Sequence, residues 1–297
     1  MQSLSSRLMP LVMTLRGAKR RYSSAELTLK RVDELRAHPA SWAPPPALAK
    51  KVRVEQTTVG GMPVYTVGPR DGTVTRVALY LHGGSYVFQI QRQHWTLIAD
   101  LAATAGIRFT VPIFPLAPEA TASTIVPTMT ELAASLITEH GARHFGLFGD
   151  SAGGGMALAV AQQLRDRGFP APRATVLISP WLDISGTDPR LAQIAPSDPW
   201  LAVPGSHAAG ELYRGDLPEL DPLVSPIYGN LLGLGPITMF SGTRDILNAD
   251  AHRLVDAAAV AGVDLDFHEA PGMIHVYPLL PIGEAKAARE VMRRAMR

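Results

Sequence analysis

Short apolar runs alternate with longer amphipathic runs over most of the chain. From about residue 51 onward, stretches rich in β-branched and aromatic residues are separated by stretches rich in Ala and Leu. This pattern predicts strands at 52–59, 62–68, 76–82, 108–114, 144–149, 174–180, 237–242 and 264–270. It predicts helices at about 91–105, 124–140, 152–167, 248–262 and 282–296.

The hydrophobicity of the central predicted strands indicates the fold class. They are continuous apolar runs rather than alternating ones, which is typical of parallel strands buried on both faces. Strand and helix alternate along the chain, which predicts an α/β fold with a mostly parallel central sheet and helices on both faces. The two leading runs, 52–59 and 62–68, predict an antiparallel hairpin at one edge.

Two regions depart from this alternation. Residues 1–50 have a helical pattern, with Ser23 or Ser24 as an N-cap, and end in the Pro-rich linker "PASWAPPPALAK". Residues at about 186–233 are rich in Pro, Gly, Asp and Leu without clear periodicity, and are too long for a simple connection. We predict a main domain over 51–297 with a helical cap inserted at about 186–233, joined by the N-terminal helices of 1–50.

Composition excludes several classes of function. The chain has 297 residues, of which 46% are hydrophobic and 18% are charged, as in globular proteins. Its net charge is only +2 and it has no basic cluster interleaved with aromatic residues, so we expect no nucleic-acid partner. It has no cysteine, which rules out a thiol nucleophile, a Cys-ligated metal and a disulfide.

Targeting signals are weak. No apolar run approaches the roughly 18 residues of a spanning helix, so we expect no stable membrane insertion. The apolar segment 8–15 is short, is broken by Pro10 and lacks a cleavage site, which favours a cytoplasmic protein. The alternative is a cationic amphipathic helix that associates with a membrane surface.

The stretch "HFGLFGDSAGGGMALAV" places glycines where a predicted strand ends and a helix begins. Each glycine costs up to about 1 kcal/mol relative to Ala in regular structure. Gly149-Asp150-Ser151-Ala152-Gly153 fits G-x-S-x-G, a tight turn that exposes a nucleophilic serine in front of a helix N-terminus. The simpler alternative is a closely packed or phosphate-binding turn, but a dinucleotide fingerprint and a P-loop lysine are both missing.

A serine hydroxyl needs a base and a group that orients the base. With this type of turn, the acid and then the histidine follow the serine along the chain. Asp245 in "SGTRDIL" comes just after a predicted strand, and His275 in "MIH" lies in a loop after the last one. Among the competitors, Asp250 fits a helix cap, His268 lies within a strand, and Asp183 fits a local turn.

A second glycine cluster, "HGGSY" at 82–86, ends another predicted strand. Acyl transfer places negative charge on a carbonyl oxygen, which backbone N–H groups stabilise. The unobstructed amides of Gly83 and Gly84, with that of Ala152 after the serine, are candidates for this oxyanion hole. The alternative is an ordinary pair of turn glycines.

The motifs "HGGSY", "FPLAPE", "GDSAGG", "SPWLDIS", "DPLVSP", "SGTRDIL" and "MIH" occur in the order seen in the bacterial hormone-sensitive-lipase-like carboxylesterases, which are α/β-hydrolases. The resemblance runs from about residue 50 to the end, and the N-terminal helices resemble part of that family's cap. It implies the α/β-hydrolase fold, with Ser151 as nucleophile, Asp245 as orienting acid and His275 as general base. It also implies an oxyanion hole formed by Gly83, Gly84 and Ala152.

The resemblance extends to supporting residues. It implies that Glu119 supports the active-site loops, that Asp150 acts beside the nucleophile, and that His82 supports the glycine loop, which continues through Ser85 and Tyr86. Ser85 replaces the family's third glycine, and His275 is followed by Val276-Tyr277 rather than Gly-Phe. The segment after Glu119 also departs from the family pattern. Because these positions border the expected pocket, they affect substrate preference more than chemistry.

The expected activity is that of a serine carboxylesterase acting on small-molecule esters with short to medium acyl chains, through an acyl-serine intermediate. No cofactor or metal is required, and a homodimer is common in the resembled family. An amide or peptide hydrolase with the same triad is one alternative. A non-catalytic ligand-binding member of the fold is another, although such members typically lose the histidine. Candidate acyl-pocket residues, each equally compatible with core packing, are Met9, Met13, Trp42 and Trp200.

Overall fold

The computed structural model describes residues 2–297 and contains an eight-stranded sheet. Its strands are β1 (Val52–Val59), β2 (Met62–Pro69), β3 (Arg76–Leu81), β4 (Ile107–Pro112), β5 (Phe145–Asp150), β6 (Ala174–Ile178), β7 (Ile237–Arg244) and β8 (Leu265–Ile274). Their order in the sheet is β1-β2-β4-β3-β5-β6-β7-β8. The expected edge hairpin is confirmed, since β1 and β2 pair antiparallel. Strand β2 also pairs antiparallel with β4, and the strands from β3 to β8 pair parallel with one another.

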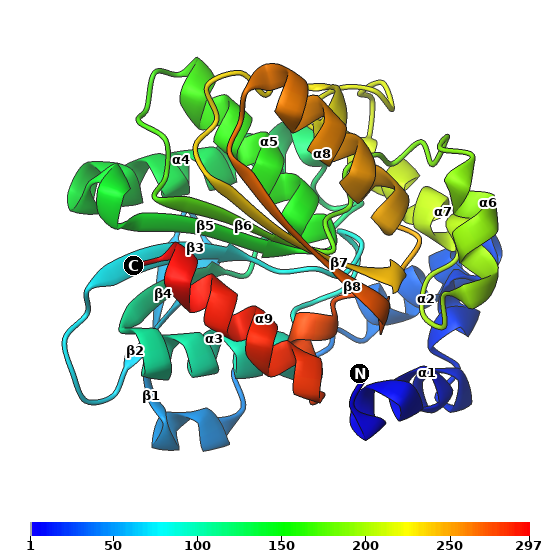
Figure 1. The fold of residues 1–297 in the computed structure, drawn as a ribbon, viewed down its shortest axis with the longest axis horizontal. Coiled ribbons are helices and arrows are strands. Elements are labelled where there is room, and N and C mark those ends of the chain that lie inside the picture. Colours follow the sequence, from blue (N-terminus) through cyan, green and yellow to red (C-terminus); the bar gives the residue numbers. More distant parts are fainter. Residues whose placement is uncertain (1) are drawn as a thin grey trace.

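Helices cover both faces of the sheet, as the α/β pattern predicts (Figure 1). One layer consists of α3 (Arg92–Ala105) and α9 (Gly283–Ala295), and the other of α4 (Ala122–His140), α5 (Ala152–Asp166) and α8 (Asn248–Ala261). The buried side chains accordingly form two apolar clusters, one on each face of the sheet. The central strands read as continuous apolar runs because both faces are covered.

The remaining helices gather beyond the carboxyl ends of the parallel strands, at the right of Figure 1. They are α1 (Leu4–Leu15), α2 (Ala25–Ala37), α6 (Arg190–Ile194) and α7 (Val203–Arg214), with the 3₁₀ turns η1 (Ala18–Tyr22) and η4 (Ala195–Ser197). Three other 3₁₀ turns lie between elements: η2 (Pro46–Lys50) before β1, η5 (Pro226–Tyr228) before β7 and η6 (Tyr277–Leu279) after β8. A further 3₁₀ turn, η3 (Ala142–His144), precedes β5. Helix α2 packs against α7, so the N-terminal segment and the 186–233 segment are neighbours in space.

Two local expectations are refined. Ser24 is the N-cap of α2, its side chain accepting a hydrogen bond from the Leu27 amide. Pro10 does not interrupt the first apolar segment: α1 continues through it, because proline removes only one backbone donor, and the Thr14 hydroxyl donates to the Pro10 carbonyl. Over the described residues 2–297, the helices are all too short or too polar to cross a membrane.

Candidate active site

Ser151 occupies the sharp turn between β5 and α5. Its backbone has φ 52° and ψ −124°, a conformation that L-residues rarely adopt. A side chain at Gly149 would collide with the Gly153 carbonyl, and one at Gly153 would collide with the Leu81 and His82 carbonyls. The glycines of the motif are therefore required because the backbone of this turn packs directly against β3 and the start of α5.

A continuous hydrogen-bonded chain runs from Ser151 to Asp245. His275 Nε2 lies 3.0 Å from Ser151 Oγ, and His275 Nδ1 lies 2.8 Å from Asp245 Oδ2. All three side chains are buried. In the tautomer that donates Nδ1–H to the carboxylate, Nε2 accepts from the serine hydroxyl. The structure thus brings together the three residues that the sequence singled out for nucleophile, base and orienting acid.

Neighbouring parallel strands position the acid and the histidine. Asp245 directly follows β7, where its Oδ1 accepts the Leu247 amide at 3.0 Å. Strand β8 is longer than expected, because a register shift between Gly242 and Arg244 lets it continue pairing with β7. His275 therefore follows the strand end immediately rather than lying in a loop beyond it.

Local electrostatics favours a charged His275. Burial opposes its imidazolium form, but the Asp245 carboxylate outweighs burial and raises the pKa of His275 above its ordinary value. A second buried carboxylate, Asp198, accepts the amides of Trp200, Leu201 and Ile246. Burial, with the nearby Asp245 charge, raises the pKa of Asp198 to about 6.

Asp150 links the serine turn to the glycine loop. Its buried carboxylate accepts hydrogen bonds from Tyr80 Oη at 2.7 Å, from the Gly83 amide at 3.1 Å and from His94 Nε2 at 3.1 Å. Burial alone would raise the pKa of Asp150, but His94 and the other two donors outweigh it and hold the pKa below its usual value. The carboxylate is therefore an ionised acceptor that joins β3, α3 and the serine turn.

The direction of the loop amides changes one expectation. Because the Gly83 N–H donates to Asp150, it is removed from the set of candidate oxyanion donors. The amides of Gly84 and Ser85 have no acceptor within residues 2–297, and both residues line the same cavity as Ser151. Ala152 is the first residue of α5, where an N–H has no acceptor within the helix.

Two loop residues adopt left-handed backbone conformations and are held by side chains from outside the sheet. Ser85 has φ 54° and Tyr86 has φ 63°. The buried Ser85 hydroxyl lies 2.9 Å from Tyr22 Oη, and the Tyr86 ring stacks on Tyr213 with centroids 3.5 Å apart. Burial raises the pKa of Tyr22, so its phenol stays protonated and available for this bond. Sequence reasoning missed Tyr22, which no motif marks.

The remaining supporting residues, His82 and Glu119, are not part of the lining of the Ser151 cavity. His82 is buried, donates from Nδ1 to the Gly83 carbonyl at 2.7 Å and stacks on Phe114. Burial, with the neighbouring His94, lowers the pKa of His82 to about 4, so it is neutral at pH 7. Glu119 is half-exposed and pairs with Arg36 of α2.

With this geometry established, comparison with known proteins defines the family. Residues 78–279 match the model of a family described as alpha/beta hydrolase fold. The chain belongs to the α/β-hydrolase family. A triacylglycerol lipase of Mycobacterium tuberculosis is 36% identical over 249 residues, covering 82% of this chain and 52% of the lipase, so the chain spans about half of that relative. An acetyl-hydrolase of Streptomyces hygroscopicus is 35% identical over 234 residues, covering 76% of this chain and 77% of the relative.

Solved structures agree with this assignment. An esterase from the bacterial hormone-sensitive lipase family superimposes with a TM-score of 0.81 at 28% identity, covering 100% of this chain and 97% of the esterase. The structure of EstE5 soaked with ethyl alcohol has a TM-score of 0.84 at 26% identity, covering 99% of both chains. This α/β-hydrolase is thus an enzyme of the esterase and lipase type, within the hormone-sensitive-lipase-like group.

The Ser151 end of the hydrogen-bonded chain opens onto a cavity of about 390 Å³. Ser151 and His275 lie at its wall, and three of the four predicted acyl-pocket residues, Met9, Met13 and Trp200, also line it. Trp42 instead lines a separate cavity of about 260 Å³, together with Glu119. Trp200 stands edge-on to the His275 ring, with centroids 5.7 Å apart.

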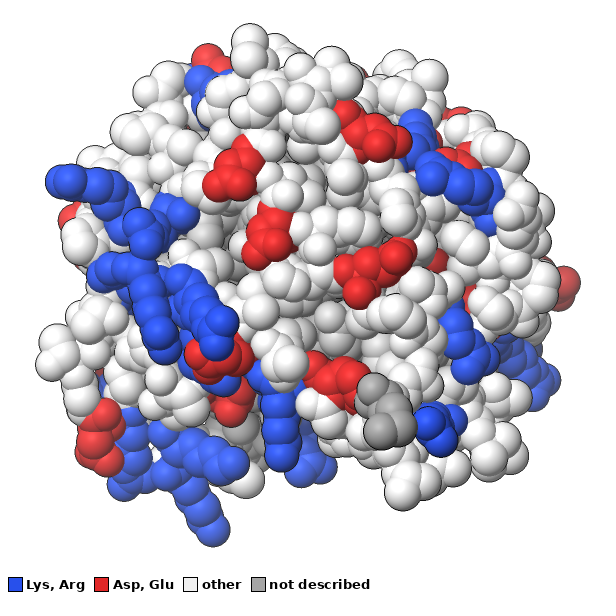
Figure 2. All heavy atoms as spheres, viewed as in Figure 1, with Lys and Arg blue, Asp and Glu red and all other residues white. Residues whose placement is uncertain are grey.

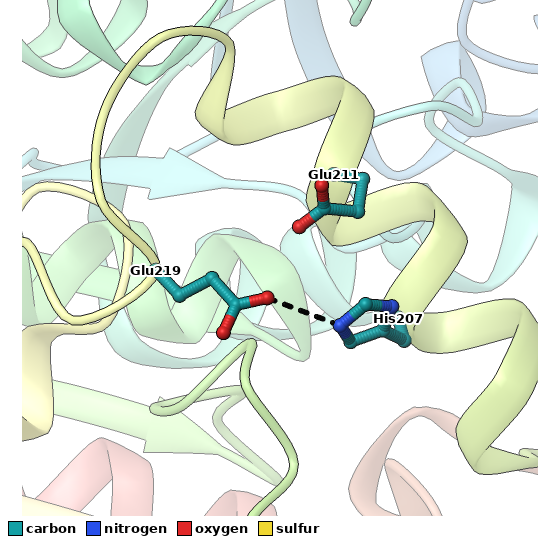
Figure 3. Close-up of side chains that lie close together, drawn as sticks. All are labelled: His207, Glu211 and Glu219. Atoms are coloured by element: carbon teal, nitrogen blue, oxygen red, sulfur yellow. Dashed lines mark hydrogen bonds and ion pairs between the residues drawn. The ribbon is translucent and has the colours of Figure 1, made fainter.

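Helix α7 and the loop that follows it also bring together three side chains with metal-ligand chemistry (Figure 3). His207 and Glu211 are four residues apart on α7, so they share one helix face, and Glu219 approaches from the following loop. His207 Nε2 lies 3.1 Å from Glu219 Oε1, while Arg214 binds both carboxylate oxygens of Glu211 at 2.7 Å. Because the guanidinium already neutralises Glu211, we interpret the group as a surface ion-pair cluster. None of these residues lines the Ser151 cavity.

Proposed function

We propose that this α/β-hydrolase is a serine carboxylesterase that hydrolyses carboxylic esters with short to medium acyl chains. The observation that carries the proposal is the unbroken chain of hydrogen bonds from Asp245 through His275 to Ser151. Ser151, at the end of this chain, lies at the wall of a cavity of about 390 Å³. We further propose that residues 1–50 and 186–233 act as a cap over the main domain 51–297, a role supported by the contribution of Tyr22 and Trp200 to the cavity wall.

In the acylation step, Ser151 Oγ attacks the ester carbonyl carbon and its proton passes to His275 Nε2. The Asp245 carboxylate keeps the imidazole in the required tautomer and stabilises the imidazolium that forms. The carbonyl oxygen becomes negatively charged and accepts hydrogen bonds from the loop amides of Gly84 and Ser85 and from Ala152. Because these donors are held in place before the reaction, they stabilise the transition state at little reorganisation cost.

Collapse of this intermediate breaks the bond to the leaving alcohol. His275 gives its proton to the departing oxygen, which leaves an acyl-serine ester. A water molecule then attacks the acyl carbon while His275 accepts one of its protons. The second tetrahedral intermediate collapses to release the carboxylic acid and return the proton to Ser151.

The cavity wall favours apolar acyl groups of limited size. Met9, Met13, Phe88 and Trp200 contribute apolar surface around the serine. The volume lies near the lower end of the range for small-molecule sites, about 300–1,000 Å³. Long acyl chains would therefore have to extend out of the cavity toward its opening, where burial contributes less to binding.

The test is turnover of a p-nitrophenyl ester series of increasing acyl length by the wild type and by Ser151→Ala. We expect a maximum at short to medium chains and a loss of about 10⁴-fold or more in kcat for the variant. Ser206→Ala is the matched control, because Ser206 is a buried serine in α7 that is outside the triad.

Three outcomes would contradict the proposal. Equal rates for the wild type and Ser151→Ala would remove the nucleophile assignment. Matched p-nitroanilides turned over faster than the esters would identify an amide hydrolase instead. If the wild type hydrolysed none of the esters, the result would favour a non-catalytic, ligand-binding protein.

A further inference from the structure

Helix α1 exposes a stripe of leucines to solvent. Leu4, Leu8, Leu11 and Leu15 are 78%, 54%, 56% and 78% exposed. Their spacing of three and four residues places them on one face of the helix. Single exposed leucines are ordinary on protein surfaces, but a contiguous row of them indicates a binding surface. We call these four residues the leucine stripe.

The opposite face of α1 is fixed to the protein. Ser6, Pro10 and Met13 are buried. At the start of the helix, the Ser3 amide and hydroxyl each donate to the Glu284 carboxylate at 2.7 Å, and the Ser6 hydroxyl donates to it at 2.9 Å. These bonds to the first turn of α9 hold the leucine stripe outward in a defined orientation.

The leucine stripe borders the catalytic cavity. Met9 and Val12 of α1, and Arg16 directly after the helix, line the cavity that contains Ser151. The stripe residues themselves are not part of that lining. A surface bound to the stripe would therefore lie beside the cavity wall, so an ester dissolved in that surface would have a short path to the serine.

Cationic side chains accompany the stripe. Arg7, Arg16 and Arg20 are exposed and have no acidic partner within residues 2–297. Lys19 is engaged differently, since its Nζ donates to the Ala195 and Asp198 carbonyls. In Figure 2, the lower right of the molecule, where α1 lies, shows uncharged surface bordered by Lys and Arg side chains. An apolar row flanked by arginines is complementary to an anionic lipid surface.

We propose that α1 docks this hydrolase onto an anionic lipid surface. The leucine stripe inserts below the headgroups, and Arg7, Arg16 and Arg20 bind lipid phosphates. Docking turns the cavity wall formed by Met9 and Val12 toward the bilayer, from which lipid-dissolved esters enter. This last element rests on the proposed esterase function, whereas lipid binding itself does not.

The experiment measures partitioning of the full chain onto vesicles of phosphatidylcholine, with and without phosphatidylglycerol, by co-sedimentation. We expect binding to the anionic vesicles that weakens as salt is added, because salt screens the arginine contribution. The Leu8→Ser/Leu11→Ser variant is expected to bind about tenfold more weakly or worse, since two leucine side chains no longer enter the apolar region. The matched control is Leu220→Ser/Leu232→Ser, which removes two exposed leucines outside α1.

Four results would overturn the proposal. The wild type could remain unbound with either vesicle; the stripe variant could bind as the wild type does; or the Leu220/Leu232 control could lose binding equally. The fourth result would show that the leucine stripe binds a second copy of the chain instead of lipid. In that case the wild type would be a dimer, the stripe variant would be a monomer, and neither protein would bind vesicles.

The design separates this proposal from the proposed function. Turnover of p-nitrophenyl acetate, dissolved in water, should be unchanged in the stripe variant, which also shows that the variant is folded. Ser151→Ala should bind vesicles as the wild type does. If no protein turns over any ester but vesicle binding follows the stripe, the esterase proposal fails while lipid docking stands.

Discussion

The proposed proton-transfer residues and the glycine loop at 82–86, the proposed oxyanion loop, meet at Ser151, but different parts of the molecule hold them. Ser151, Asp245 and His275 each follow a strand of the parallel sheet and form one hydrogen-bonded chain, and Trp200 of the 186–233 segment stands edge-on to His275. The oxyanion loop follows β3 and is held from the sheet side by Asp150, but from the other side by Tyr22 of the N-terminal segment and Tyr213 of α7. In the proposed mechanism, the sheet therefore positions the nucleophile and the base, while the proposed cap positions part of the loop that stabilises negative charge.

Removing the sheet-borne acid should have the largest effect. Asp245→Asn keeps the size of the side chain but removes the charge that orients and stabilises His275. We expect kcat on p-nitrophenyl esters to fall by about 10⁴-fold, as in comparable triads. Steady-state kinetics measures this, and Asp250→Asn, which changes a carboxylate outside the triad, is the control. A loss of less than tenfold would mean that Asp245 does not orient the base.

The pH dependence of kcat/KM should reflect the ionisation of His275 beside Asp245. Because His275 must be neutral to accept the serine proton and its pKa is raised, kcat/KM should rise with pH through an apparent pKa above 6.5. Below that pKa the rate should fall about tenfold per pH unit, since only the neutral fraction reacts. A profile of kcat/KM from pH 5 to 9 checks this. A rate that is flat over that range would contradict the assignment of His275 as base.

The Tyr22→Phe variant tests whether the N-terminal segment positions the glycine loop through the bond between Tyr22 and Ser85. Loss of the hydroxyl frees the Ser85 side chain and the loop amide next to it, so we expect kcat to fall about tenfold, less than the 10²–10³-fold cost of deleting a donor. Affinity for a transition-state analogue should fall in parallel, with KM nearly unchanged. Tyr65→Phe, at another buried tyrosine, is the control.

Ser85→Gly sharpens this test through a double-mutant cycle. Glycine adopts the left-handed conformation without strain and has no hydroxyl to hold. In the Ser85→Gly background, Tyr22→Phe should therefore cost little. Equal losses in both backgrounds would show that Tyr22 acts on the reaction by some route other than Ser85.

The smallest effect is expected at the contact between α7 and the N-terminal segment. A side chain at Gly205 would collide with the backbone of Tyr22 and with Thr28. We expect Gly205→Ala to lower the free energy of unfolding by about 1–3 kcal/mol and to reduce kcat severalfold as Tyr22 shifts. Thermal unfolding and kinetics measure both, with Gly68→Ala, where a methyl group meets only ordinary contacts, as the control. A fully active Gly205→Ala would show that the cap adjusts without displacing Tyr22.

Local signals in the sequence were sufficient for the sheet and for the three residues of the hydrogen-bonded chain from Ser151 to Asp245. The sequence pattern predicted all eight strands to within a few residues at each end. The central strands were clearest, because burial on both faces leaves a continuous apolar run. The glycines around Ser151 identified the turn because the backbone contacts there exclude any side chain. His275 and Asp245 followed from their places just after strands.

What the sequence did not reveal depends on contacts between distant segments. The Gly83 amide points to Asp150, a direction that the glycine pair itself does not specify. Tyr22 is 63 residues away from Ser85, and no motif connects them. His207 and Glu211 have a helical spacing that could have been noticed, but Glu219 joins them only through the fold of the following loop.

The bond between Ser3 and Glu284 joins residues that are 281 positions apart. A ribosome makes the chain from the N-terminus, so α1 is synthesised long before α9 but cannot take its place until α9 begins to emerge. During that interval both its leucine stripe and its inward face, with Pro10 and Met13, are uncovered. Unfinished chains therefore expose more apolar surface than the completed protein, and are the species most exposed to aggregation or to capture by chaperones.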